Sequence, residues 1–176
     1  MKFKKTFILL LLCTILVIPI FVAIFAMSKK DQLIEKKFNR ENILLDELKL
    51  FKRDGSKYDL THIKNNKNTI LIIFNKDCEI CQVELKAIAD DFKKFENSNV
   101  LLISSNSEST YQFLNKKPYN LLKRKNVQLL HDNENLLYKK MRIRSTPSIL
   151  VFDRNHRIKN IYEGFHSLDL LELDKN

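Results

Sequence analysis

Residues 69–95 restrict the possible folds of this chain more than any other stretch. An apolar run, TILIIF at 69–74, is followed almost at once by Cys78 and Cys81. A continuous run of this length, rich in β-branched residues, predicts a central strand that is buried on both faces. Apolar residues then recur with helical spacing, which predicts a helix whose apolar side is formed by Val83, Leu85, Ile88, Phe92 and Phe95.

The rest of the sequence alternates between strand-like and helix-like segments. Further strands are predicted at 99–105 and 127–132, helices at 109–123 (interrupted by Pro118), 133–143 and 167–175, and hairpins at 48–60 and 147–164. The first hairpin turns at Asp54-Gly55, a strong turn signal. Strands separated by helices, with a hairpin near the end, indicate an α/β fold with a central mixed β-sheet flanked by helices.

The N-terminal segment is apolar and uncharged. Residues 6–26 contain no charged side chain, and Lys2, Lys4 and Lys5 precede them. Such a run is long enough for a helix that crosses a bilayer. Lysines on its N-terminal side favour a cytoplasmic N-terminus, with the rest of the chain beyond the membrane.

We therefore expect a single-pass protein of the cell membrane with an extracytoplasmic domain, in the periplasm or at the cell exterior. The expected parts are an N-terminal membrane anchor or uncleaved signal at 1–27, a stem helix or linker at 28–45, and a globular domain at 46–176. A cleaved signal peptide is the alternative, because AMS at 26–28 is a usable cleavage site.

The net charge of +10 does not indicate a nucleic-acid partner. The lysines are scattered among acids instead of being clustered, and an exported domain does not meet nucleic acid. Solubility and attraction to an anionic membrane surface explain the charge better.

Cys78 and Cys81 have three possible roles. A structural disulfide between them closes so small a loop that it restrains the unfolded chain very little. A zinc site needs four ligands, whereas the pair supplies two and the histidines do not fall at zinc-finger spacing. Because thiolates also suit Cu(I), copper relay stays open as an alternative.

The third role is a redox pair, and the position of the cysteines favours it. At the start of a helix, free N–H groups and the helix dipole stabilise the thiolate of Cys78. Cys81, one turn further, is expected to be more buried and to keep its proton. Cys78 can then attack a substrate disulfide, and Cys81 can resolve the mixed disulfide.

A strand, a Cys-x-x-Cys pair, a helix and the later sequence STPSILVF at 145–152 together resemble a thioredoxin-fold protein. More narrowly, residues from about 46 to 165 resemble the membrane-anchored thiol–disulfide oxidoreductases of the TlpA-like group. The resemblance implies a cis-proline at Thr146-Pro147 that faces the redox pair and presents backbone groups to a substrate. It also implies that Glu84, three residues after Cys81, accepts a proton.

The sequence departs from this group at two positions. Asp77 stands where an aromatic residue usually precedes the first cysteine, and Lys86 stands where a helix proline is expected. The negative charges of Asp77 and Glu79 oppose thiolate formation at Cys78. We therefore expect a more reducing pair than in strong oxidants of the DsbA kind.

Peroxiredoxins share the fold, but their sequences contain a Pro-x-x-x-Thr-x-x-Cys pattern. Counting back from Cys78 gives Asn75 and Leu71, and counting back from Cys81 gives Cys78 and Phe74. Neither set fits the pattern, so the sequence disfavours peroxide reduction.

The sequence thus predicts a monomeric thiol–disulfide oxidoreductase that reduces protein disulfides. It needs no cofactor and no metal, because the cysteines carry the electrons, and a membrane electron-delivery protein would recharge the pair. Its partners would be protein dithiols or disulfides. The alternative is a non-catalytic thioredoxin-like binding module or a copper-relay protein. Copper-relay proteins of this fold, however, have a Cys-x-x-x-Cys pattern, whose spacing is one residue longer than the spacing here.

Overall fold

The computed structural model describes residues 18–20, 22, 25, 43–63, 66–105, 107–133, 135–171 and 173. Most of the predicted anchor at 1–27, and the predicted stem up to residue 42, lie outside the described residues. The few described positions of the anchor are helical. Among the residues described, no helix combines the length and the hydrophobicity needed to cross a membrane.

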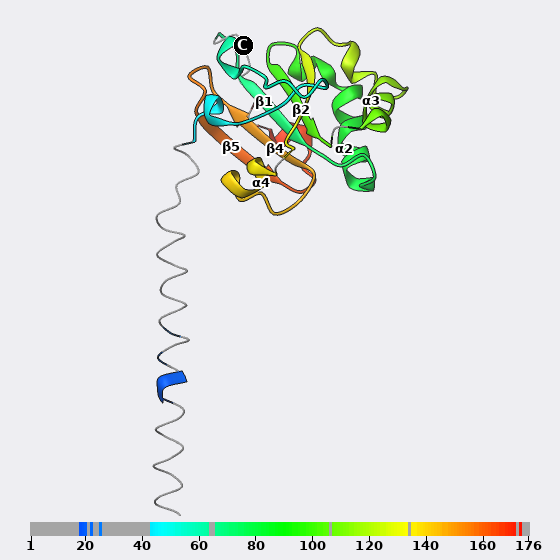
Figure 1. Cartoon of the computed structure of the whole chain (residues 1–176). Helices are drawn as coiled ribbons and strands as arrows, with labels where there is room; N and C mark the ends of the chain where they lie inside the picture. The colour runs from blue at the N-terminus through cyan, green and yellow to red at the C-terminus, as the bar shows by residue number, and fades with distance from the viewer. Residues whose placement is uncertain are drawn as a thin grey trace, which may run out of the picture. The chain divides into compact units, whose positions relative to one another are not determined.

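A five-stranded mixed sheet forms the centre of the domain (Figure 1). The strands are β1 (Thr69–Ile73), β2 (Asn99–Ser104), β3 (Val127–His131), β4 (Ser148–Phe152) and β5 (Ile158–Glu163), in the order β3-β2-β1-β4-β5. The pairs β1–β2 and β2–β3 are parallel, whereas β1–β4 and β4–β5 are antiparallel. All five residues of β1 are buried, so the predicted central strand is confirmed.

Helices connect and cover the strands. They are α2 (Glu79–Asp90), α3 (Glu108–Asn115) and α4 (Leu136–Met141), with 3₁₀ turns at η2 (Leu45–Glu47), η3 (Leu60–His62), η4 (Phe92–Phe95), η5 (Leu121–Lys123) and η6 (Leu168–Leu170). Helix α3 ends before Pro118, as the sequence predicts, and the bond between Lys117 and Pro118 is cis.

The predicted final helix at 167–175 is wrong for the residues that the structure describes there. They form only the 3₁₀ turn η6. Leu168 and Leu171 are both buried. The three-residue period of a 3₁₀ turn places residues i and i+3 on the same side, so one turn is enough to bury both.

One face of the sheet packs against α2, η4 and α3. Alternate strand residues such as Ile70, Leu102 and Ile149 share one buried cluster with Leu85 and Leu114 of the helices. Val83 does not belong to this cluster, contrary to the prediction, and its side chain is 54% exposed. It lies two residues before Leu85, which is about 200° around the helix, so it faces solvent.

The segment 43–51 connects two parts of the sheet. Leu44 forms a β-bridge with Arg157 just before β5, and Phe51 forms one with His131 of the edge strand β3. Ile43 and Leu45 are buried, so these residues belong to the folded domain and not to a stem helix. The adjoining hairpin at Asp54-Gly55 is present but short.

Candidate active site

The two cysteines lie where β1 leads into α2. Cys78 is the N-cap residue of α2 and forms a disulfide with Cys81, with a Cα–Cα distance of 5.2 Å. The Sγ atom of Cys78 accepts a hydrogen bond from the backbone N–H of Cys81 at 3.2 Å. Cys78 is half-buried, whereas Cys81 is 0% exposed. One sulfur is therefore accessible and faces the helix N–H groups, and the other is shielded.

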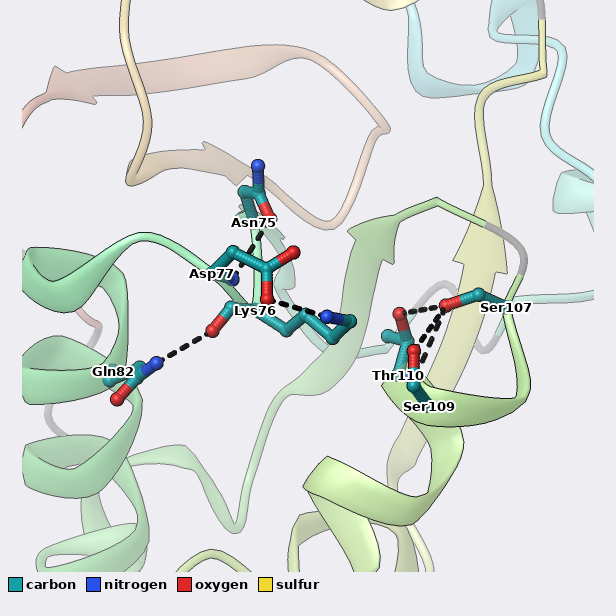
Figure 2. Close-up of polar contacts among 7 residues, drawn as sticks. All are labelled: Asn75, Lys76, Asp77, Gln82, Ser107, Ser109 and Thr110. Carbon is teal, nitrogen blue, oxygen red and sulfur yellow. Dashed lines mark hydrogen bonds and ion pairs between the residues drawn. The ribbon is translucent and has the colours of Figure 1, made fainter.

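The loop before Cys78 is held by its own side chains (Figure 2). The backbone N–H of Asp77 donates to Oδ1 of Asn75 at 3.0 Å, and Nε2 of Gln82 donates to the carbonyl oxygen of Lys76 at 2.7 Å. The ammonium group of Lys76 pairs with the Asp77 carboxylate at 2.5 Å. These bonds tie the loop to α2 and so fix the direction in which Cys78 points.

A second helix begins beside this loop. Ser107 is the N-cap residue of α3, and its Oγ accepts the backbone N–H of Thr110 at 3.2 Å (Figure 2). The carboxyl ends of β1 and β2 thus each lead into a capped helix, as is common in parallel sheets. This arrangement places the redox loop at the carboxyl edge of the sheet.

The residues predicted to face the cysteines are close to them. The bond between Thr146 and Pro147 is cis. The carbonyl oxygen of Thr146 lies 3.9 Å from Sγ of Cys78. This proximity follows from the sheet, because Ser148 of β4 pairs with Ile73, the last residue of β1.

Glu84 is buried in α2 and is not a solvated surface acid. Its side chain is 0% exposed, and it lies one turn from Cys81 on the buried face of the helix. Oε1 accepts a hydrogen bond from the backbone N–H of His166 at 3.2 Å, whereas Oε2 has no partner within the described part of the chain. Burial raises the pKa of the Glu84 carboxyl, and the hydrogen bond and charge of His166 offset this only in part.

The turn Gly164–His166 is part of the site, although the sequence analysis did not identify it. The backbone N–H of Gly164 donates to the carbonyl oxygen of Pro147 at 2.8 Å. Two residues later, His166 binds Glu84. Gly164 has a φ of +85°, a conformation that favours glycine. One signal was available, since Gly164 is one of only two glycines in the chain and follows a predicted strand.

The described residues include no group of three or more His, Cys, Asp or Glu side chains arranged to hold a metal ion. What the site does contain is a disulfide with one accessible sulfur, the carbonyl of Thr146 beside it and a buried carboxyl on the side of the second sulfur. These are the groups that disulfide exchange by two-step thiol attack requires.

The fold and the site define a thioredoxin-like α/β protein with a mixed five-stranded sheet. The chain belongs to the AhpC/TSA family, which it matches over residues 44–161. Solved structures of this fold include a secreted disulfide oxidoreductase of Mycobacterium tuberculosis as well as a peroxiredoxin. No curated protein matches the sequence significantly.

Several solved structures have the same fold. DsbF of Mycobacterium tuberculosis, determined in mixed oxidised and reduced forms, is 16% identical with a TM-score of 0.56, over 70% of this chain and 89% of that chain. The exposed lipoprotein thioredoxin of Streptococcus pneumoniae is 23% identical with a TM-score of 0.50, over 69% and 92%. The reduced 2-Cys peroxiredoxin of Plasmodium vivax is 19% identical with a TM-score of 0.50, over 69% and 71%.

Proposed function

We propose that this protein is a membrane-anchored, extracytoplasmic thiol–disulfide oxidoreductase of the TlpA-like kind, which reduces disulfides in protein substrates. The observation that carries the proposal is the Cys78–Cys81 disulfide at the first turn of α2, with Sγ of Cys78 3.9 Å from the Thr146 carbonyl oxygen. A purely structural disulfide this short in sequence would add little stability, so a chemical role explains it better.

The reaction begins with the reduced protein. The Cys78 thiolate attacks one sulfur of the substrate disulfide, forms a mixed disulfide and releases the other substrate sulfur as a thiolate. Cys81 then loses its proton to the Glu84 carboxylate and attacks Sγ of Cys78, which releases the second substrate thiolate. The substrate gains two electrons and the protein becomes the Cys78–Cys81 disulfide.

The buried carboxyl and the proline loop support the two remaining roles. A raised pKa brings Glu84 closer to the pKa of a thiol, which makes its carboxylate a better proton acceptor than a surface acid. The carbonyl oxygen of Thr146 lies 3.9 Å from Sγ of Cys78, which supports a role of the Thr146-Pro147 backbone in binding an extended substrate segment.

The direction of electron flow rests on charge. Asp77 and Glu79 flank Cys78, and both are exposed. Their negative charges oppose the Cys78 thiolate and partly offset the stabilisation that the helix dipole gives it. A less stable thiolate disfavours the reduced form, which makes the pair a better reductant. Two electrons from a membrane electron-delivery protein regenerate the reduced pair. The apolar run at 6–26 supports the membrane location.

Reduction of insulin by the purified reduced protein tests the activity. We expect the parent protein to reduce insulin and the Cys78→Ser variant to be inactive. A parent protein without activity, or a variant as active as the parent, would instead indicate a non-catalytic binding module.

Hydrogen peroxide consumption distinguishes the other chemistry found on this fold. Leu71 and Asn75 occupy the positions of the Pro and Thr of the peroxiredoxin pattern before Cys78. We therefore expect peroxide to be consumed no faster by the parent protein than by Cys78→Ser. Rapid, Cys78-dependent consumption would contradict the proposal.

A further inference from the structure

A cavity of about 700 Å³ lies beside the redox loop. It lies at the carboxyl ends of the parallel strands β1, β2 and β3, the edge of an α/β sheet where ligands usually bind. Asp77, which immediately precedes Cys78, is among its lining residues. A group bound in this cavity would therefore lie close to the sulfur that attacks the substrate.

Three of the residues that line the cavity are apolar. Ile73 and Phe74 at the end of β1 and Ile103 near the end of β2 line it, and all three are buried in the sheet.

The rim of the cavity is acidic. Asp77 has a side chain that is 72% exposed, and Asp132 follows strand β3. The Asp132 carboxylate is fixed in place, because Oδ2 accepts the backbone N–H of Leu137 at 2.8 Å. Tyr138 completes this side of the rim. No lysine or arginine is among the described lining residues, although the chain as a whole is strongly basic.

The contact between Lys76 and Asp77 shows that this carboxylate accepts an ammonium group from a neighbour (Figure 2). That ion pair is exposed on the Asp77 side, so a second cation can compete with it at low cost. In the TlpA-like group, which this chain resembles, an aromatic residue usually precedes the first cysteine. Such a residue at position 77 would offer no charge at this point of the rim.

We propose that the cavity receives a lysine or arginine side chain of the substrate, so that the site prefers polypeptides with a basic residue near the reacting disulfide. This inference rests on the proposed thiol–disulfide function. Lysine and arginine carry a cationic head that can form charge-assisted hydrogen bonds with the carboxylates of the acidic rim. The Tyr138 ring adds a surface on which the cation can lie.

Two peptide substrates, each containing a disulfide, test the proposal. They differ only at three positions next to the reacting cysteine. One peptide carries lysine at these positions and the other glutamate. We expect kcat/KM for reduction to be roughly 3- to 30-fold higher for the lysine peptide, the preference that two partly exposed ion pairs provide. The preference should shrink as salt is raised from 50 to 500 mM.

The variants Asp77→Asn and Asp132→Asn should each reduce the ratio of the two kcat/KM values, and the double variant should bring it close to one. The ratio is informative because a change in the reactivity of Cys78 affects both peptides equally and cancels. Glu96→Gln is the matched control, since this exposed acid follows η4 near the start of β2, at the opposite end of the sheet, and should keep the parent ratio.

The outcomes separate the two proposals. If both peptides are reduced with equal kcat/KM, or if the glutamate peptide is preferred, the cavity proposal is wrong while the proposed function stands. If the parent protein reduces neither peptide nor insulin, the proposed function fails and the cavity proposal fails with it.

Discussion

The backbone N–H of His166 donates a hydrogen bond to Oε1 of Glu84 across 82 positions of sequence, at 3.2 Å. The bond anchors one oxygen of a buried carboxyl and leaves Oε2 without a partner in the described part of the chain. A carboxyl in such surroundings holds its proton more tightly than a surface acid. The bond also connects the turn after β5 to the helix that carries both cysteines.

Glu84→Gln should slow resolution of the mixed disulfide by about 10²-fold, because the amide cannot accept the proton of Cys81. The first attack by Cys78 should change little. Rapid-quench trapping of the mixed disulfide between the protein and a substrate peptide measures the two steps separately. Asp90→Asn, an exposed acid at the end of the same helix, is the control and should behave as the parent does.

The same variant should change how stability depends on pH. Because burial raises the pKa of Glu84 in the folded state, its contribution to stability is fully present below the pKa of the unfolded chain and is lost as pH rises through the folded-state pKa. Glu84→Gln removes this loss and should be more stable than the parent at pH 8, by on the order of 1 kcal/mol. Urea unfolding of the oxidised proteins from pH 4 to pH 8 checks it, and a difference independent of pH would contradict it.

Cys81→Ala should trap substrates on Cys78. Without the resolving thiol, the mixed disulfide has no intramolecular route to release. Non-reducing electrophoresis of membranes that contain the variant should show covalent adducts, which dithiothreitol should cleave by reducing the mixed disulfide. The double variant Cys78→Ser, Cys81→Ala should show none, and adducts that persist in it would mean that Cys78 is not the attacking residue.

The double variant Asp77→Asn, Glu79→Gln should make the redox pair more oxidising. Removing two negative charges beside Cys78 stabilises its thiolate and so the reduced form, by on the order of 20 mV for exposed charges. Equilibration with glutathione buffers measures the potential. A parent potential close to that of DsbA, about −120 mV, would contradict the expected reducing character.

Tyr111→Phe should destabilise the domain by about 1 kcal/mol. His131 is fully buried, and burial lowers its pKa, which favours the neutral ring. Nδ1 donates to the Ser104 carbonyl oxygen at 3.0 Å, which leaves Nε2 to accept the hydroxyl of Tyr111 at 2.8 Å. The variant leaves Nε2 buried without that donor. Chemical denaturation measures the loss, with Tyr119→Phe as a control that keeps its ring contact with Phe113.

The parts of the fold that local patterns determine could be predicted from sequence. The β1 run, the helix after the cysteines and the interruption at Pro118 each depend on periodicity or on backbone chemistry within a few residues. The cis bond at Thr146-Pro147 came from the resemblance and not from any local pattern, and the structure confirms it.

The parts that tertiary contacts determine could not be predicted from sequence. Glutamate is usually a surface residue, yet Glu84 is buried on the inner face of α2, where the backbone N–H of His166 binds it. Valine is usually a core residue, yet Val83 is exposed because the sheet lies on the other side of α2. The helical period itself separates Val83 from Leu85 by about 200°, so the prediction that placed both on one apolar side was wrong on local geometry. The burial of Glu84 depends instead on where the neighbours of α2 lie, which the pattern around the helix does not state.

The bridge between Phe51 and His131 affects how the isolated domain would behave in a test tube. The two residues exchange backbone hydrogen bonds of 2.9 and 2.8 Å along the outer side of β3, which is the last strand of the sheet. A recombinant fragment that starts at residue 52 would retain both cysteines and the proline loop, yet it would uncover that strand. Neighbouring molecules could then add to it edge to edge, so precipitation of such a fragment would say nothing about its chemistry.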